Sequence, residues 1–544
     1  MKNFFQKNRM YKIIDHGIFA FVFCSVIIFI LLPFFCVLKE AFFENGSISF
    51  AAFRSVFKKS GMLLRNSFVV ALLTSLLTAL ASIATALFFF TAHKKLQKLI
   101  FAILSISMIS PPFVTALTYI NLFGRRGMIS YYLFGISANP YGMLGIVLMQ
   151  SLSNFSLGSL ILIGFLKNMD RFEIDSARNL GANTNAVICD IILPKIFPAI
   201  KSLLLLTFFR SLADFGTPAV IGGACNVMAT ESYFALIAHG DIQRSAILNI
   251  MILLPALVIF LFYRKSFKNV STVSKGQSAS ELQLKRRGIV YYGISIIALF
   301  FLLWITVQYC SIILSAFTRM KKGKLIFSIQ NFIETQEFIG GSTIRSIRYS
   351  VIAAVGTTVI GFFIAYYAQI RKSRLIRPLN FIATLPYIIP GTFFGLGYLL
   401  AFKSPPLALT GTASIVVLNM LFKQTPFSVN IATAAMSDIN CDVLNAVRDL
   451  GGSRINEVGD AVVPLSLHGI ALSFLNAFKS SMTTMGSIIF LVYPGQKVLT
   501  LVMFDAIQSA KYNVGSVIAL LIIAICVSMN LLYMPVLRKL ETKR

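Results

Sequence analysis

Charged residues are scarce in this chain. Only 13% of its 544 residues are Asp, Glu, Lys or Arg, whereas 57% are hydrophobic, and the mean hydropathy is +0.79. A soluble fold of this length cannot bury so much apolar side chain. Apolar stretches of about 20 residues, long enough to cross a hydrocarbon core of about 30 Å, recur from one end of the chain to the other. The composition excludes a water-soluble globular protein and predicts about twelve spans of a lipid bilayer.

Cysteine and histidine are also few, and neither forms a cluster of the kind that binds metal. The seven cysteines show no C-x-x-C pairing, and the four histidines are dispersed. This pattern disfavours a disulfide scaffold, a zinc site and an iron site. No nucleophile, base and orienting acid can be assembled from the sequence either. We therefore expect neither a metal site nor an enzyme.

A nucleotide-binding loop is missing as well. The Gly323-Lys324 dipeptide is followed by Leu and has no glycine five residues before it, so the pattern GxxxxGK[ST] is absent. We expect any ATP to be bound by another protein.

The positive charge of the chain has a topological explanation. The formal net charge is +29, but Lys and Arg lie between apolar spans and form no continuous basic face, so no nucleic-acid partner is expected. Basic residues precede the first span, follow the sixth and close the chain, which predicts that both termini are cytoplasmic. The basic group from Arg319 to Lys324 falls on the predicted outer side and goes against this rule.

The chain is predicted to be all-α, with two six-helix halves. Helix is preferred because an isolated strand cannot satisfy its backbone hydrogen bonds in lipid. A polar stretch at 265–287 has the composition of a flexible linker and divides the chain into halves at 1–264 and 288–544. Prolines inside the third and ninth spans predict kinked helices. The predicted spans are 17–38, 66–91, 98–122, 142–166, 199–221, 245–263, 288–316, 350–370, 379–402, 411–436, 468–493 and 513–536.

One polar segment occurs twice. Four residues of the first copy recur in the second at a constant spacing of 270 positions, which chance gives about once in 10⁵ placements. Glycine suits the left-handed position just past a helix end, so each copy is predicted to be two short helices joined by a turn. The second helices are expected over about 183–193 and 453–463, each ending at the proline. The recurring residues are Arg178, Leu180, Gly181 and Pro194, matched by Arg448, Leu450, Gly451 and Pro464.

These motifs resemble the permease subunits of bacterial ATP-binding-cassette importers. In that family a cytoplasmic loop carries the pattern E-A-A, three residues, G and a later proline. The stretches Ser211–Asp241 and Ser481–Gly495 resemble fused, two-half permeases of the ferric-iron group. The resemblance covers nearly the whole chain and implies the permease fold of type I importers in the bacterial inner membrane.

The resemblance also assigns roles to the two copies, here called the first repeated segment (about 173–198) and the second repeated segment (about 442–465). Each is implied to dock on a separate ATP-hydrolysing subunit, which implies two copies of that subunit, with ATP and Mg²⁺ bound there, and an extracytoplasmic substrate-binding protein. Both copies depart from E-A-A, and Asn445 lacks the acid. The positions carried over are Asp175, Ser176, Ala177, Gly181 and Pro194 in the first segment and Asn445, Ala446, Val447, Gly451 and Pro464 in the second.

A substrate pathway is suggested by polar residues within spans, because charges there are costly and usually face a bundle interior. Arg210 and Asp214, four apart on one predicted helix, share a face and fit either an internal ion pair of the pathway or a structural pair. The related part of the eleventh span carries Lys479, Ser481, Thr483 and Thr484, whose hydroxyls fit either a pathway or contacts between helices.

The cargo implied by the resemblance is ferric iron, which a partner protein would hold before release. Similar permeases carry phosphorylated sugars, phosphonates, thiamine or polyamines, and nothing in the residues separates these. The rival from another class is an ion-coupled secondary transporter, for which Asp214 is the main coupling carboxylate. Copurification with an ATPase distinguishes the two.

Overall fold

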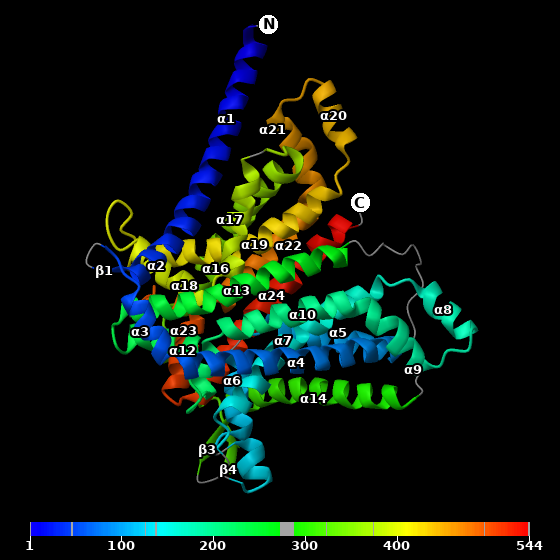
Figure 1. Cartoon of the computed structure of the whole chain (residues 1–544), viewed down its shortest axis with the longest axis vertical. Coiled ribbons are helices and arrows are strands. Elements are labelled where there is room, and N and C mark those ends of the chain that lie inside the picture. The colour runs from blue at the N-terminus through cyan, green and yellow to red at the C-terminus, as the bar shows by residue number, and fades with distance from the viewer. Residues whose placement is uncertain are drawn as a thin grey trace. The chain divides into compact units, whose positions relative to one another are not determined.

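The computed structural model describes residues 2–541 other than 45–46, 112, 126, 137–138, 272–287, 322–323, 374 and 494. The described chain is mainly helical, as predicted, and it forms two compact units (Figure 1). Most of the predicted linker and Pro112 lie outside the described residues. The part of the linker that is described, 265–271, continues the preceding helix.

The first-segment unit comprises Arg54–Phe338 and Met503–Ile523 and contains the first repeated segment. Its elements are α4 (Gly61–Thr91), α5 (Lys94–Ile109), α6 (Phe113–Phe123), η2 (Met128–Leu133), α7 (Met143–Lys167), α8 (Arg171–Asn179), α9 (Thr184–Ala186), η3 (Val187–Ile192), α10 (Leu193–Ala213), α11 (Gly216–Ile221), α12 (Met228–Ile237), α13 (Ile242–Ser271), α14 (Ile289–Phe317), β3 (Thr318–Lys321), β4 (Lys324–Phe327) and α15 (Gln330–Ile339), where η marks a π-helical turn.

The second-segment unit comprises Met1–Phe53, Ile339–Val502 and Ala524–Arg544 and contains the second repeated segment. Its elements are α1 (Lys2–Val26), η1 (Ile27–Leu31), α2 (Leu32–Phe42), β1 (Phe43–Glu44), β2 (Ser47–Ile48), α16 (Ser342–Ala365), η4 (Tyr366–Ile370), α17 (Ile376–Ile388), α18 (Gly391–Ala401), α19 (Ala413–Ser437), α20 (Cys441–Asp449), α21 (Arg454–Asn456), η5 (Glu457–Val462) and α22 (Val463–Thr483). Four described helices cross the unit boundaries: α15, whose last residue Ile339 falls in this unit, α3 (Ala51–Lys59), α23 (Leu499–Gln508) and α24 (Tyr512–Glu541).

The core of the first-segment unit is a group of packed long helices. In Figure 1, α4, α7, α10 and α14 run side by side, and α4 contacts each of the other three. Buried polar groups join them: the Thr74 hydroxyl on α4 lies 3.3 Å from Gln150 Oε1 on α7, and Ser151 donates to the Thr74 carbonyl over 3.3 Å. Such hydrogen bonds hold helices together where lipid removes the hydrophobic drive for association.

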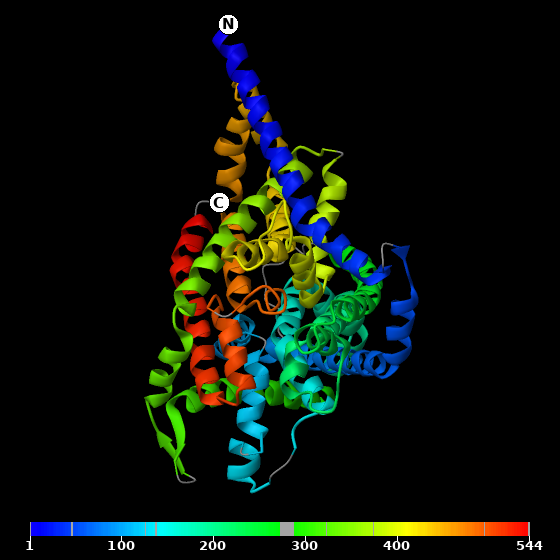
Figure 2. The same ribbon diagram turned by 90° about the vertical axis from the view of Figure 1, so that its left-hand side faces the viewer.

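The core of the second-segment unit is built in the same way. Helices α16, α19 and α22 pack against one another. Ser428 and Ser473 share a hydrogen bond of 2.6 Å between α19 and α22, and the Thr357 hydroxyl on α16 donates to the Leu421 carbonyl over 2.9 Å. Figure 2 shows α22 beside α24, where the ring of Phe474 stacks on that of Tyr533.

Each unit also includes a helix from a distant part of the chain. In the first-segment unit α14 packs on α4, and in the second-segment unit α2 packs on α18. The Tyr398 hydroxyl donates to the Phe29 carbonyl over 2.9 Å, which ties α18 to η1. The compact units therefore cross the predicted division at 264–288, and the division into two sequence halves stays a prediction.

The number of spans differs from the predicted twelve. Among the described residues, nine helices are long and apolar enough to cross a membrane, or up to eleven when two bent pairs count as one span each. The predicted tenth span is α19, which is absent from that count because buried polar residues lower its hydropathy: Asn419, Gln424, Thr425 and Ser428. A helix inside a bundle needs no fully apolar surface.

Proline marks the breaks in the predicted spans. The third span is α5 and α6, which meet at 105° beside Pro111, and the ninth is α17 and α18, which meet at 115° beside Pro390. These are full breaks and not the kinks that the sequence predicted. The fifth and eleventh predicted spans also end early, at Ala213 and Thr483, where α10 and α22 stop.

Candidate functional site: two repeated helical segments

The first repeated segment begins with a capped helix. Asp170 precedes α8 and accepts a hydrogen bond from the Phe172 backbone N–H over 2.9 Å, the usual role of an N-cap. Ile174 is buried and anchors the helix, while Phe172 is 70% exposed. After the turn, Asn183 caps α9 by accepting from the Ala186 N–H over 2.9 Å.

The second repeated segment has the same construction. Asn440 caps α20 by accepting from the Asp442 N–H over 3.1 Å, and Leu444 is the buried anchor. Ser453 caps α21 and forms a capping box with Asn456. Every element of this segment starts and ends 270 residues after its counterpart, from α20 through α22.

A glycine turn ends the first helix of each segment. Gly181 has a φ of +91° and Gly451 a φ of +80°, the left-handed region that glycine occupies without strain. Space is not the constraint, because a Cβ at either glycine would meet no atom within 4 Å. The turn leaves Leu180 and Leu450 each 89% exposed. Two equivalent leucines at the tips of two projecting turns form a matched pair of apolar contact points.

The predicted end of the second helix at Pro194 and Pro464 is wrong. Helices α9, η3 and α10 form one continuous helix from Thr184 to Ala213, and α21, η5 and α22 do so from Arg454 to Thr483. A π-helical turn ends two residues before each proline, and the wider turn accommodates a residue that has no N–H and a bulky ring. The second helix of each repeated segment is therefore the first part of a long apolar helix.

Ion pairs differ between the segments. In the first, Arg178 lies 3.6 Å from Asp175 on the same helix, and Lys195 pairs with Glu173. In the second, Arg448 of α20 contacts both carboxylate oxygens of Glu457 in η5 at 3.0 Å. Glu457 has no exposed surface.

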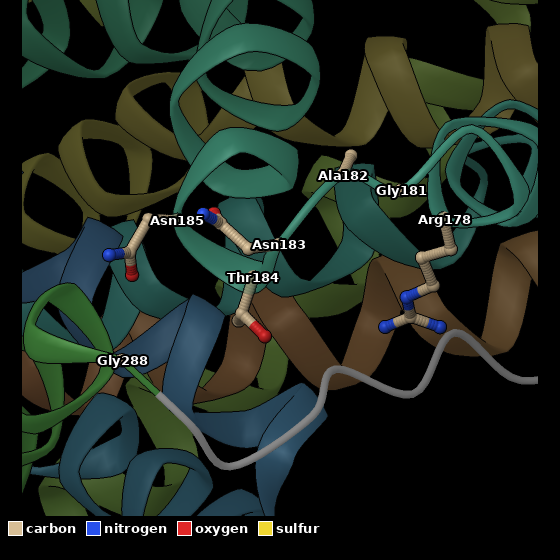
Figure 3. Close-up of a pocket in the computed structure, with 7 residues that line it drawn as sticks. All are labelled: Arg178, Gly181, Ala182, Asn183, Thr184, Asn185 and Gly288. Carbon is tan, nitrogen blue, oxygen red and sulfur yellow. The ribbon is translucent and has the colours of Figure 1, made fainter.

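A pocket of about 350 Å³ lies beside the first turn. Arg178 comes from α8, Asn183, Thr184 and Asn185 come from the start of the next helix, and Gly288 comes from the start of α14 (Figure 3). Gly288 has a φ of +104°, and a Cβ there would stand 2.5 Å from Asn185 Oδ1. This contact brings α14 close to the first segment.

The residues predicted for a pathway in the fifth span lie where α10 ends. Asp214 is the first residue past the helix, in extended backbone, so the predicted helical spacing from Arg210 is wrong. The Asp214 carboxylate accepts hydrogen bonds from Gln150 Nε2 over 3.0 Å and from the backbone N–H groups of Gly216 and Thr217. It thereby caps α11 and holds it to α7.

The residues predicted in the eleventh span lie at the end of α22. Thr483 donates to the Lys479 carbonyl over 3.0 Å, within the helix, and Thr484 accepts from Gln424 Nε2 over 3.3 Å, which joins α22 to α19. Ser481 is buried. Its hydroxyl has no hydrogen-bond partner among the described residues.

Sequence reasoning missed three charged residues that organise the second-segment unit. Lys423 of α19 donates to the carbonyls of Pro386 and Ile389 over 2.7 and 2.6 Å, at the break between α17 and α18. Asp15 of α1 lies 2.9 Å from Arg371. The third is Glu457. A charge inside an apolar run was the available signal for Lys423, whereas Arg371, the partner of Asp15, lies 356 residues away in sequence.

Within the part of the chain that the structure describes, no three His, Cys, Asp or Glu side chains gather closely enough to hold a metal ion.

Comparison with known proteins agrees with this architecture. Residues 77–272 match the model of the family described as binding-protein-dependent transport system inner membrane component. The chain is 29% identical over 443 residues to a ferric transport system permease protein of Actinobacillus pleuropneumoniae, a match that covers 78% of this chain but only 64% of that relative.

Two further relatives cover more of their own length. A putative ferric transport system permease protein of Haemophilus influenzae is 28% identical over 498 residues, 88% of this chain and 78% of the relative. A probable ABC transporter permease protein of Sinorhizobium fredii is 21% identical over 470 residues, 81% of each. Residues 77–272 therefore form a domain that matches the family of binding-protein-dependent transport system inner membrane components.

Proposed function

We propose that this chain is the transmembrane permease of an ATP-driven importer, which takes up ferric iron delivered by an extracytoplasmic binding protein. The observation that supports this proposal most directly is the pair of repeated segments. Each presents an 89% exposed leucine at the tip of a turn, and each continues directly into a long apolar helix. A contact point joined rigidly to a span suits the transmission of force from a partner.

The two leucines are the contacts that the partner would cover. Burial of a leucine side chain contributes about 1.5–3 kcal/mol, so water is a poor permanent environment for both. Two equivalent contact points fit two copies of one ATP-binding subunit, which binds ATP and Mg²⁺. In this arrangement the segments face the cytoplasm, as do both termini, and closure of the partner moves α10 and α22.

The proposal that the cargo is ferric iron rests on the similarity of this chain to ferric transport permeases. Both ferric transport relatives match 78–88% of this chain. Ferric iron would be held tightly by the binding protein and then cross a route formed by the permease. Residues such as Asp214, Lys479 and Thr484 lie where long helices end, and we assign them to the surroundings of that route.

The test is copurification of the chain with an ATP-binding subunit. Leu180→Glu with Leu450→Glu places two charges at the tips of the turns without touching the core, because both side chains are exposed. We expect the double variant to fold, to insert in the membrane and to lose the ATPase. Ile48→Glu, at a leucine-sized residue of β2 that is 64% exposed, is the matched control and should retain it. Retention of the ATPase by the double variant contradicts the proposal.

A further inference from the structure

A second construction is also repeated in the chain. Strands β1 and β2 pair into a short hairpin that leads into α3, and β3 and β4 pair into a hairpin that leads into α15. The Ser49 backbone N–H donates to the Phe42 carbonyl over 2.8 Å, and the Ser328 N–H donates to the Phe317 carbonyl over 2.8 Å. Helix α15 starts 279 residues after α3. The two constructions are here named the first cap (β1, β2 and α3) and the second cap (β3, β4 and α15).

Equivalent side chains hold both caps together. Ser49 accepts a hydrogen bond from the backbone N–H two residues later over 3.3 Å, and Ser328 does the same over 3.1 Å. The ring centroid of Phe53 lies 5.4 Å from that of the hairpin phenylalanine in the first cap. The corresponding distance from Phe332 in the second cap is 4.9 Å. Phe332 and Ser328 stand 279 residues after Phe53 and Ser49, so the caps are copies of one construction.

Helix α15 lies at the end of α14 that is farthest from the first repeated segment. Helix α14 begins beside that segment, where Gly288 approaches Asn185. Its 29 residues place its other end about 40 Å away. At that end Asn331 of α15 donates to the carbonyls of Ala316 and Thr318 over 3.0 and 2.9 Å. The second cap is therefore fixed to the far end of α14.

Helix α3 lies at the corresponding end of α4. Lys167, which closes α7 just before the first repeated segment, has its Nζ 5.7 Å from the ring centroid of Phe89. Helix α3 directly precedes Gly61, which is about 40 Å from Phe89 along α4. Residues 54–59 of α3 and 330–338 of α15 belong to the first-segment unit, and Figure 1 shows α3 and the β3–β4 hairpin away from α8. In the proposed function α8 faces the cytoplasm, so both helices face the opposite side of the membrane.

The two caps carry opposite charges at their helices. Helix α3 is basic and its three charged side chains are exposed, whereas α15 is acidic. Glu337, which is exposed, stands 279 residues after Lys58. The hairpins reverse this order, and Arg319 of β3 pairs with Glu334 over 2.7 Å. The charged residues are Arg54, Lys58 and Lys59 of α3, Glu334 and Glu337 of α15, Glu44 of β1, and Arg319, Lys321 and Lys324 of β3 and β4.

A lipid surface does not account for both caps. A basic helix that also carries apolar side chains suits anionic headgroups, but the same headgroups repel an acidic helix. The positive-inside rule also places Lys and Arg on the cytoplasmic side, whereas the bases of α3 and β3 lie on the other side in the proposed function. A protein partner with an acidic patch and a separate basic patch suits both helices.

From these observations we propose that the two caps dock the extracytoplasmic binding protein and that their opposite helix charges select one orientation of it. The binding protein presents an acidic patch to α3 and a basic patch to α15. In the reversed orientation, like charges face one another at both helices, which suppresses that mode of docking. This inference rests on the proposed function and gives its outer partner a docking surface and an orientation.

The direct test is photocrosslinking in cells that produce the chain together with its binding protein. Phe50 and Ile329 directly precede α3 and α15 and are 65% and 62% exposed. Benzoylphenylalanine at either position should crosslink to the binding protein, position 50 to an acidic peptide and position 329 to a different, basic peptide. Leu76, inside α4 and 51% exposed, is the control position and should crosslink to lipid. Lipid adducts alone at 50 and 329, or one common peptide, overturn the proposal.

Matched charge reversals test the electrostatic part. Lys58→Glu and Glu337→Lys change exposed, equivalent positions, so both variants should fold. Each should slow association of the purified binding protein with the reconstituted permease about fivefold at low salt, and the difference should vanish at high salt. Lys95→Glu, at an exposed residue in the first turn of α5, is the control and should leave the rate unchanged. Unchanged rates for Lys58→Glu and Glu337→Lys overturn the proposal.

Failure of this inference is distinguishable from failure of the proposed function. A chain that copurifies with an ATP-binding subunit but gives only lipid adducts at positions 50 and 329 refutes the docking surface alone. The two expected binding-protein adducts without any ATP-binding subunit refute the ATP-driven importer and leave the docking surface intact.

Discussion

The two repeated segments share their outer geometry and differ at their base. Both have a capped helix, a buried apolar anchor, a left-handed glycine and a leucine that is 89% exposed. At the base, Arg448 of the second segment pairs with the buried Glu457, and Arg454 lies near Asp15. The first segment has Val187 at the position of Glu457, and an ion pair of Glu173 with Lys195 joins α8 to α10. The shared part includes the exposed leucines that we propose as partner contacts, and the divergent part contacts the protein's own helices.

The difference shows that a repeated segment need not be held to its neighbouring helices by the same side-chain contacts in both copies. A buried ion pair fixes the relative orientation of two helices, whereas an apolar contact permits small sliding. Substitutions at matched positions of the two segments test this difference.

The largest difference is expected for the arginines. Arg448→Met leaves Glu457 buried without a cation, which should lower the free energy of unfolding by about 3–5 kcal/mol. Arg178→Met should cost only about 0–1 kcal/mol, because Asp175 is 40% exposed and stays solvated. Thermal unfolding of both variants in detergent measures the difference. Equal losses would mean that the two bases are equivalent.

An intermediate effect is expected for the connection to α1. Asp15→Asn keeps the shape of the side chain but removes the charge that faces Arg371 and Arg454, which should cost about 1–3 kcal/mol. Asp460→Asn, at an exposed acid in the same segment, is the control and should cost less than about 0.5 kcal/mol. Unfolding midpoints of the two variants are compared, and a control as damaging as Asp15→Asn contradicts the special role of Asp15.

The smallest effect is expected at the two glycine turns, and it should be the same for Gly181 and Gly451. Gly181→Ala and Gly451→Ala each force a Cβ into left-handed backbone, at about 1–2 kcal/mol. Asparagine tolerates this conformation better, so Gly181→Asn and Gly451→Asn should cost less. The same unfolding measurement applies. A large loss at one glycine and none at the other would show that the turns are not equivalent.

The sequence allowed prediction of the features that depend on residues close together in the chain. Apolar runs predicted helical spans, and the recurrence of Leu180-Gly181 as Leu450-Gly451 predicted the glycine turns, which the backbone angles confirm. Helix ends near proline were predicted less well. A π-helical turn lets Pro194 sit near the start of α10 inside one continuous helix, and local propensity gives no sign of that turn.

Features that depend on tertiary contacts could not be predicted in this way. Asp15 and Arg371 are 356 residues apart, and nothing in either neighbourhood indicates the other. The position of Asp214 depends on the end of α10 at Ala213. The sequence around Ala213 reads as one continuous apolar run and gives no sign that the helix ends there. Helix α19 carries polar residues that neighbouring helices bury. These residues lower its mean hydropathy, so a count of spans based on composition alone misses this helix.

The most direct test of the account is uptake into proteoliposomes that contain the chain, its copurifying ATPase and the ferric-iron binding protein. We expect iron to accumulate when hydrolysable ATP is supplied in the ATPase-facing compartment. We expect no accumulation with a non-hydrolysable analogue or after Leu180→Glu with Leu450→Glu. Accumulation driven by an ion gradient in the absence of ATP would contradict it.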